Sequence, residues 1–121
     1  MSKNMEISFL LDFYGDMLTE KQRTMVDYYY NEDLSLAEIA ENEGITRQGV
    51  RDSIKRAEAQ LLEMEERLAL AARFRSMQND LLIVQENAKL LRQVNDLNGR
   101  IPEMYDIADA IQAAAERMSE A

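Results

Sequence analysis

The sequence predicts an all-α protein in which a helix-turn-helix module is followed by long C-terminal helices. Three features favour helix throughout. The 121 residues include only one proline and four glycines, so few positions interrupt a helix. Apolar residues recur at spacings of three and four along much of the chain, which is the helical period. A half-buried strand shows alternating apolar and polar residues, and no stretch of β-branched residues in this sequence has that pattern.

Two helices are predicted before the helix-turn-helix. The first covers residues 5–17, and Gly15 is expected to fray its end. Its apolar face consists of Phe9, Leu10, Phe13, Tyr14 and Met17. The second covers residues 20–31, because Thr19 and Gln22 have the spacing of a capping box. Its inward residues are Met25, Val26, Tyr29 and Tyr30.

Two further helices joined by a tight corner are predicted within residues 34–62, LSLAEIAENEGITRQGVRDSIKRAEAQLL. Ser35 and Glu38 have capping-box spacing, so the first helix is expected to begin there. Gly44 can adopt the left-handed conformation that ends a helix, and Thr46 can cap the next helix. Helices joined by a short turn containing glycine form a helix-turn-helix. The inward residues of the second of these helices are Val50, Ile54, Ala57 and Leu61.

The helix after Thr46 carries the only concentrated positive charge in the sequence. Residues 46–56 sum to +3, whereas residues 1–45 sum to −7 and residues 57–121 to −5, which gives the chain its net charge of −9. Nucleic-acid phosphates bind basic surfaces, so this helix is predicted to contact nucleic acid. A solvated helix face in a packing unit is the alternative. The candidate contact residues are Thr46, Arg47, Gln48, Arg51, Asp52, Lys55 and Arg56.

The composition argues against an enzyme. The chain has no cysteine and no histidine, which removes the usual zinc ligands, the thiol nucleophile and histidine acid–base catalysis. We find no glycine-rich phosphate loop and no aspartate spacing typical of a metal loop, so no cofactor or metal is expected. The longest aliphatic run has four residues, 81–84. Neither a signal peptide nor a membrane span is therefore predicted, and the protein is expected in the cytoplasm.

The end of the basic helix is harder to predict. No glycine or proline occurs between Val50 and Asn98, so the helix could continue to about Ala72. The most polar stretch that follows, residues 73–80, RFRSMQND, is the predicted place of a bend, and one very long helix is the alternative. We therefore expect a helix-turn-helix domain of residues 1–72 and a helical extension of residues 73–121.

A heptad pattern in the extension predicts a dimer. Spacings of four and three alternate along a seam composed of Ile83, Asn87, Leu90, Val94, Leu97 and Ile101. A single asparagine among β-branched residues at such positions fixes register in two-stranded coiled coils. Packing of this helix on its own chain is the alternative. Asn98 and Gly99 end the helix, and Pro102 can begin another. That last helix has the apolar residues Met104, Ile107, Ala108, Ile111, Ala115 and Met118, and would form half of a hairpin.

Residues 18–61, LTEKQRTMVDYYYNEDLSLAEIAENEGITRQGVRDSIKRAEAQL, resemble the fourth domain of bacterial sigma factors. For this chain the resemblance implies that the helix after Thr46 enters a DNA major groove, with Arg47 and Gln48 at base-reading positions and Arg51 at a phosphate. Two features depart from that pattern. A glycine, Gly49, lies inside the helix, where it costs about 1 kcal/mol relative to alanine, and a carboxylate, that of Asp52, replaces a neutral polar group.

The chain resembles the small YlxM-like helix-turn-helix family more closely, most strongly over about residues 7–70. This resemblance implies a cytoplasmic bacterial protein encoded beside the GTPase of the signal recognition particle, and an accessory or regulatory role in that pathway. The basic helix would then bind the RNA of the particle or an acidic surface of the GTPase. Base readout would not be needed in that case.

Overall fold

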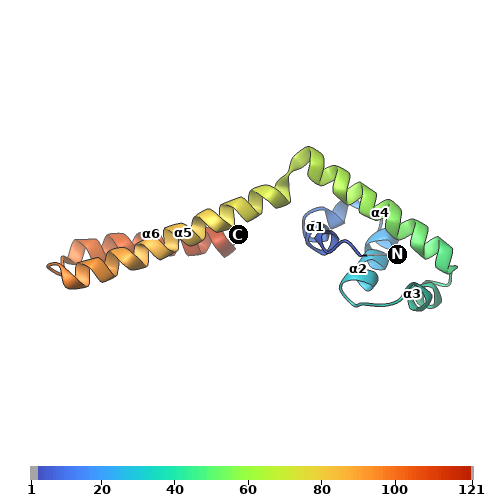
Figure 1. Ribbon diagram of the computed structural model, residues 1–121, viewed down its shortest axis with the longest axis horizontal. Coiled ribbons are helices and arrows are strands. Elements are labelled where there is room, and N and C mark those ends of the chain that lie inside the picture. Colours follow the sequence, from blue (N-terminus) through green and yellow to red (C-terminus); the bar gives the residue numbers. More distant parts are fainter. Residues whose placement is uncertain (1–2, 121) are drawn as a thin grey trace. The chain divides into compact units, whose positions relative to one another are not determined.

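The computed structural model describes residues 3–120, and the regular structure in this range is entirely helical, so the predicted all-α class is confirmed. The contacts divide the chain into two compact units, residues 1–72 and 73–121. The elements, coloured along the chain in Figure 1, are α1 (Glu6–Tyr14), the 3-10 turn η1 (Gly15–Met17), α2 (Glu20–Tyr30), α3 (Leu36–Glu43), α4 (Arg47–Leu68), α5 (Leu70–Leu97) and α6 (Pro102–Glu120).

The first unit is organised around α4, which packs against α1, α2 and α3 (Figure 1). The predicted inward residues of α4 are confirmed, because Val50, Ile54, Ala57 and Leu61 are all 0% exposed. The predicted inward residues of α2 are buried too. Because these residues of α4 are three or four positions apart, they lie on one side of the helix, and this side packs against the other three helices.

The predicted inner face of the first helix is only partly correct. The buried residues are Ile7, Leu10, Leu11 and Tyr14, and Phe9 and Phe13 are partly buried against the same core. Met17 was expected on this face but is 69% exposed. The reason is that the chain tightens into η1 at Gly15. A 3-10 turn has three residues per turn rather than 3.6, so Met17 leaves the face that α1 established.

The predicted caps and corner of the helix-turn-helix are confirmed. Both capping boxes are formed, the first by Thr19 and Gln22 and the second by Ser35 and Glu38. Gly44 ends α3 with φ +67°, in the left-handed region that glycine adopts without steric cost. Thr46 caps α4. The local signals in this stretch therefore agree with the tertiary structure.

The predicted bend in residues 73–80 is wrong, because these residues are helical and α4 ends earlier, at Leu68. The break is at Ala69, which adopts the left-handed conformation with φ 55°. Alanine has no local preference for this conformation. Tertiary contacts must therefore stabilise the left-handed conformation of Ala69, and helical periodicity does not reveal such contacts.

Those contacts form what we call the junction cluster: Tyr14, Glu65, Leu70, Ala71 and Ala72. The backbone N–H of Leu70 donates to the Tyr14 hydroxyl at 3.0 Å. The N–H groups of Ala71 and Ala72 donate to the two carboxylate oxygens of Glu65, both at 3.0 Å. Free N–H groups at a helix start need acceptors, so these side chains cap the first turn of α5.

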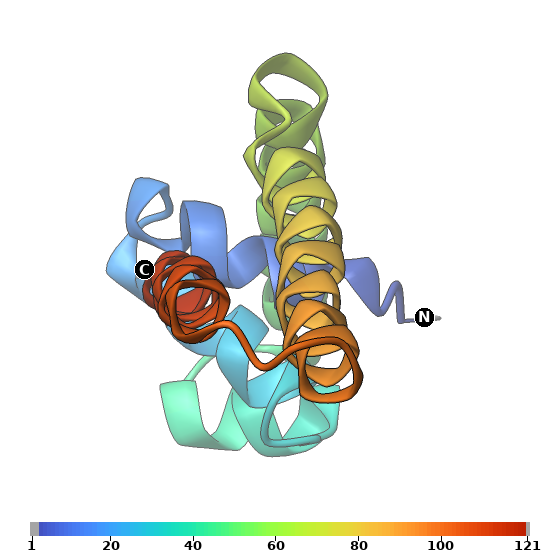
Figure 2. The same cartoon turned by 90° about the vertical axis from the view of Figure 1, so that its left-hand side faces the viewer.

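The second unit consists of a hairpin in which α6 returns alongside the part of α5 that lies in this unit (Figures 1 and 2). Its turn is held by Asn95, which is 2% exposed. The Asn95 amide donates to the Ile101 carbonyl oxygen at 2.8 Å and accepts from the Ile101 N–H at 2.9 Å. Gly99, with φ +95°, lets the chain reverse here.

The predicted heptad seam is not the surface of α5 that faces α6. The buried residues of this unit are Leu81, Ala88, Asn95, Ala108 and Ala115. Ile83 and Leu90, both in the predicted seam, are instead 59% and 53% exposed. A rotation of 100° per residue places them on the opposite side of α5 from Leu81 and Ala88. Dimerisation through Ile83, Asn87, Leu90, Val94 and Leu97 stays a prediction.

Candidate nucleic-acid interface

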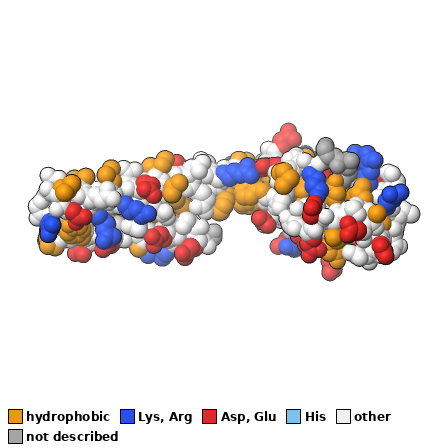
Figure 3. Space-filling model, turned by 60° about the horizontal axis from the view of Figure 1, so that its bottom comes forward, with side chains coloured by type: hydrophobic (Ala, Val, Ile, Leu, Met, Phe, Trp, Pro, Cys, Tyr) orange, Lys and Arg blue, Asp and Glu red, His pale blue; other side chains and the backbone are white. Residues whose placement is uncertain are grey.

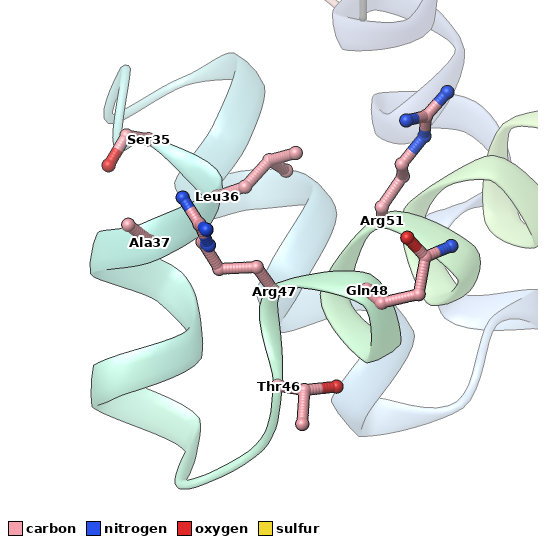
Figure 4. Close-up of a pocket in the computed structure, with 7 residues that line it drawn as sticks. All are labelled: Ser35, Leu36, Ala37, Thr46, Arg47, Gln48 and Arg51. Atoms are coloured by element: carbon pink, nitrogen blue, oxygen red, sulfur yellow. The ribbon is translucent and has the colours of Figure 1, made fainter.

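The start of α3 and the first turns of α4 enclose an open groove of about 600 Å³ (Figure 4). Its lining residues are Ser35, Leu36, Ala37, Thr46, Arg47, Gln48 and Arg51. The predicted contact residues Thr46, Arg47, Gln48 and Arg51 are thus brought together in this groove. Asp52, Lys55 and Arg56 do not line it, although they are exposed on the same helix. The contribution of α3 was missed from the sequence, where only the capping box at Ser35 marked this helix start.

The cap of α4 fixes the position of its first turn. The Thr46 hydroxyl accepts a hydrogen bond from the N–H of Gly49 at 3.0 Å. A Cβ atom added at Gly49 would lie 3.2 Å from that hydroxyl oxygen, closer than carbon and oxygen ordinarily approach. Glycine therefore leaves room for the cap, which gives a structural reason for a residue that is unfavourable inside helices.

The basic side chains of α4 are open to a ligand. Arg47, Arg51, Lys55 and Arg56 are all exposed. Within residues 3–120, none of these four forms an ion pair within 4.0 Å. By contrast, Arg67, farther along the same helix, pairs with Glu63 at 3.1 Å. An unpaired exposed cation can exchange its counterions for a phosphate without first breaking a contact in the protein.

Two acidic side chains of α4 are turned to the core side of the helix. Glu58 accepts a hydrogen bond from the Tyr30 hydroxyl, and Glu65 accepts one from the Tyr14 hydroxyl, both at 2.7 Å. Burial is the main cause that raises the pKa of both tyrosines, and the hydrogen bond to the carboxylate is the second. These tyrosines therefore remain hydrogen-bond donors. The hydrogen bond to Tyr30 on α2 directs the Glu58 carboxylate toward the core, and within residues 3–120 Glu58 forms no ion pair with Lys55 or Arg56.

A polar pair stands beside the groove. The amide nitrogen of Gln48 donates to an oxygen of Asp52 at 2.9 Å, one helical turn away. Gln48 retains its amide oxygen and one N–H, and Asp52 retains a carboxylate oxygen, as groups that can bond to a ligand. Figure 4 shows Gln48 and Arg51 extending from α4, whereas Arg47 reaches toward the start of α3.

The groove also lies where two helices begin. The first turns of α3 and α4 both line it, and the N-terminal end of a helix carries a partial positive charge. Together with Arg47 and Arg51, this arrangement suits an anion with several oxygen atoms, such as a phosphate group.

Comparison with known proteins agrees with the helix-turn-helix fold. Residues 1–99 match the sequence model of the UPF0122 family, described as "Putative helix-turn-helix protein, YlxM / p13 like". The chain belongs to this family. A UPF0122 protein of Desulforamulus reducens is 44% identical, over 78% of this chain and 73% of its own length. One of Acetivibrio thermocellus is 41% identical, over 88% and 99%. One of Bacillus cereus strain AH187 is 39% identical, over 93% and 96%.

The UPF0122 match extends well beyond the helix-turn-helix. It includes every element of the first unit, with all the candidate contact residues, and the whole of α5. Only α6 lies entirely outside the matched range. Among residues 3–120, no helix of this UPF0122 protein has both the length and the apolar content to cross a bilayer.

Proposed function

We propose that the protein is a non-enzymatic, cytoplasmic helix-turn-helix regulator that binds nucleic acid through the first turns of α4. One observation carries the proposal. In a chain of net charge −9, the four basic side chains of residues 46–56 are exposed and have no ion-pair partner among the described residues. Such a local concentration of free cations is the electrostatic signature of a phosphate-binding surface.

The residues divide by chemistry between the phosphates and the bases. Arg51, Lys55 and Arg56 are suited to phosphate contacts, which supply affinity but no sequence information. Arg47 and Gln48, at the first turn, are suited to base edges in a major groove, where arginine pairs with guanine and glutamine with adenine. Asp52 would repel a phosphate, but its carboxylate can accept a hydrogen bond from the amino group of cytosine.

A second candidate function is that of an accessory module of the signal recognition particle. The protein would then bind the RNA or the GTPase of the particle. The net charge of −9 favours it. A long duplex presents phosphates to the whole face of a bound protein, so the acidic remainder of the chain would be repelled. A small structured RNA, or an acidic protein surface, could engage residues 46–56 alone.

The proposal is tested by fluorescence anisotropy at low salt with a pool of genomic duplexes and, separately, with the RNA of the particle. We expect Arg51→Ala to weaken binding to every nucleic-acid ligand and to lower the slope of log K against log salt by about 0.9. Arg67→Ala is the matched control, because Arg67 is an exposed arginine of the same helix that already pairs with Glu63.

Four outcomes can be distinguished. Binding of the duplex pool supports the regulator. Retention of only the particle's RNA, or of only its GTPase in a pull-down, supports the accessory module. Absence of binding to any duplex or structured RNA at low salt refutes nucleic-acid contact. Equal effects of Arg51→Ala and Arg67→Ala would place the binding surface elsewhere.

A further inference from the structure

The second unit leaves most of its apolar side chains exposed. Leu81 is its only large aliphatic residue that is buried in the described part of the chain; the other buried residues are Ala88, Asn95, Ala108 and Ala115. The exposed large hydrophobic residues are Met77, Leu82, Ile83, Val84, Leu90, Val94, Leu97, Ile101, Met104, Ile107, Ile111 and Met118. Where exposed apolar residues form a contiguous surface, they usually mark an interface.

One edge of the hairpin is closed by polar side chains. The Arg92 guanidinium on α5 pairs with Asp109 on α6 at 2.9 Å, and the Tyr105 hydroxyl on α6 donates to the Asp96 carboxylate on α5. At 100° per residue, Arg92 and Asp96 lie on one side of buried Ala88. This edge therefore has its own internal contacts.

On α6, Tyr105 and Asp109 lie on one side of buried Ala108, whereas Met104, Ile107 and Ile111 lie on the other. On α5, Val84 and Leu91 lie on the side of Ala88 that is opposite to Asp96. Because Asp96 meets Tyr105 on the closed edge, these apolar residues of the two helices share the opposite edge.

We call that surface the hairpin face and define it as Val84, Leu91, Met104, Ile107, Ile111 and Met118. Except for the partly buried Leu91, its residues are exposed. Ile83, Leu90 and Val94 continue it around α5, so the predicted heptad seam joins the same apolar surface. Figure 3 shows hydrophobic side chains reaching the surface along this unit.

We propose that the hairpin face binds the hairpin of a second copy of this chain, which produces a four-helix bundle. The face contains residues from two helices, so a partner with two helices covers it better than a single helix does. Heptad spacing supports this packing, since Val84 and Leu91 lie seven residues apart on α5, as do Met104, Ile111 and Met118 on α6.

The two helices of the hairpin have net charges of opposite sign, and this holds also without Arg92, Asp96 and Asp109 of the closed edge, which leaves +1 on α5 and −3 on α6. Helix α5 sums to +1, from Arg73, Arg75, Lys89 and Arg92 against Asp80, Glu86 and Asp96. Helix α6 sums to −4, from Arg117 against Glu103, Asp106, Asp109, Glu116 and Glu120. In a two-fold arrangement each surface meets the same surface of its partner. If α5 lies over the partner's α6, both of the resulting helix pairs unite charges of opposite sign.

The size of the unit also favours a second copy. A two-helix unit of 49 residues that buries mainly alanines has little core of its own, and units of this size are commonly completed by oligomerisation. Pairing two hairpins would supply that core without any other component.

The test is sedimentation equilibrium of the full chain, without nucleic acid, from about 1 to 100 µM. We expect the wild type to approach twice its mass of 14.0 kDa. Ile111→Glu, and independently Val84→Glu, would place an unpaired carboxylate within the interface and should raise the dissociation constant of the dimer about 100-fold or more.

Gln93→Glu is the matched control for Val84→Glu, because it adds the same charge to α5 at an exposed position on the side of Ala88 that carries Arg92 and Asp96. It should leave the dimer intact. The proposal would be overturned if the wild type remained a monomer throughout this range. It would also be overturned if the Ile111→Glu variant and the Val84→Glu variant each still formed a dimer. Disruption by Gln93→Glu as strong as that by Val84→Glu would exclude the hairpin face. None of these masses depends on nucleic-acid binding.

Discussion

The Tyr14 hydroxyl donates to the Glu65 carboxylate at 2.7 Å and accepts the N–H of Leu70 at 3.0 Å. One side chain of α1 thus contacts both the end of α4 and the start of α5. Tyr14 is 2% exposed, and hydrogen bonds to charged groups are stronger than neutral ones. This buried contact stabilises a helix break that residues 65–72 encode only in part, through the hydrogen bonds of Glu65 with Ala71 and Ala72.

We therefore predict that Tyr14→Phe lowers the free energy of unfolding by about 1–3 kcal/mol. The substitution keeps the ring but removes the donor to Glu65 and the acceptor for Leu70. The Leu70 N–H then loses its partner and the Glu65 carboxylate loses one of its hydrogen bonds, both in part-buried surroundings. Urea unfolding followed by circular dichroism measures the loss. Tyr105→Phe is the control, since the Tyr105 hydroxyl also bonds a carboxylate, that of Asp96, but at an exposed position. An equal loss in both variants would contradict the role of burial.

The helix ends show which parts of the fold were predictable from sequence. The corner at Gly44 and the caps at Ser35 and Thr46 depend on residues within four positions of each other, and all were predicted. The break at Ala69 depends on Tyr14, more than fifty positions away in the sequence. Helical periodicity carries no information about such a contact, so the bend was instead assigned to the polar residues 73–80.

A second prediction concerns pH. Burial and a carboxylate partner raise the pKa of Tyr14 and of Tyr30 from the ordinary 10.0. Both tyrosines thus stay neutral in the folded protein at pH values where the unfolded chain ionises them. Stability from this difference is fully present below pH 10 and is lost as pH rises from there through the folded pKa values. Each group contributes a slope of about 1.4 kcal/mol per pH unit.

Unfolding in urea at several pH values between about 9 and 11 measures that slope. The double variant Tyr14→Phe, Tyr30→Phe should be less stable at pH 8 but should lose stability less steeply above pH 10. Equal slopes in the double variant and the wild type would mean that these two hydroxyls do not control alkaline unfolding.

The third prediction concerns base reading. Arg47→Ala and Gln48→Ala should narrow the difference in affinity between preferred and random duplexes, by about 1–3 kcal/mol at the affected position. The reason is that these side chains extend from the first turn of α4 into the groove. Selection of binding sites from a random pool, repeated with each variant, measures the change. Lys55→Ala, farther along α4, should instead weaken all sequences alike.

Local sequence patterns identified the candidate contact residues of α4 and the two helices of the hairpin. They did not show that α3 lines part of the groove, or which side of α5 faces α6. Charge and spacing marked Arg47 and Arg51, since both properties are visible in neighbouring residues. The α3 side of the groove, including Ala37, carries no distinctive chemistry and becomes part of the site only through the corner at Gly44. Likewise, the heptad pattern of Ile83 and Leu90 is real, but α6 packs on the other side of α5.

The last prediction compares two left-handed helix ends. Gly44 has φ +67° and Ala69 has φ 55°. A Cβ added at Gly44 would meet no atom within 4 Å, so Gly44→Ala should cost about 1 kcal/mol through backbone strain alone. Ala69→Gly should relieve the same strain. Because glycine also gains freedom in the unfolded chain and a partly buried methyl group is lost, we expect a smaller stabilisation, about 0.5 kcal/mol. Thermal unfolding of both variants measures these opposite signs. Destabilisation by Ala69→Gly would show that its methyl contacts outweigh the strain, and that the junction cluster holds Ala69 at little cost.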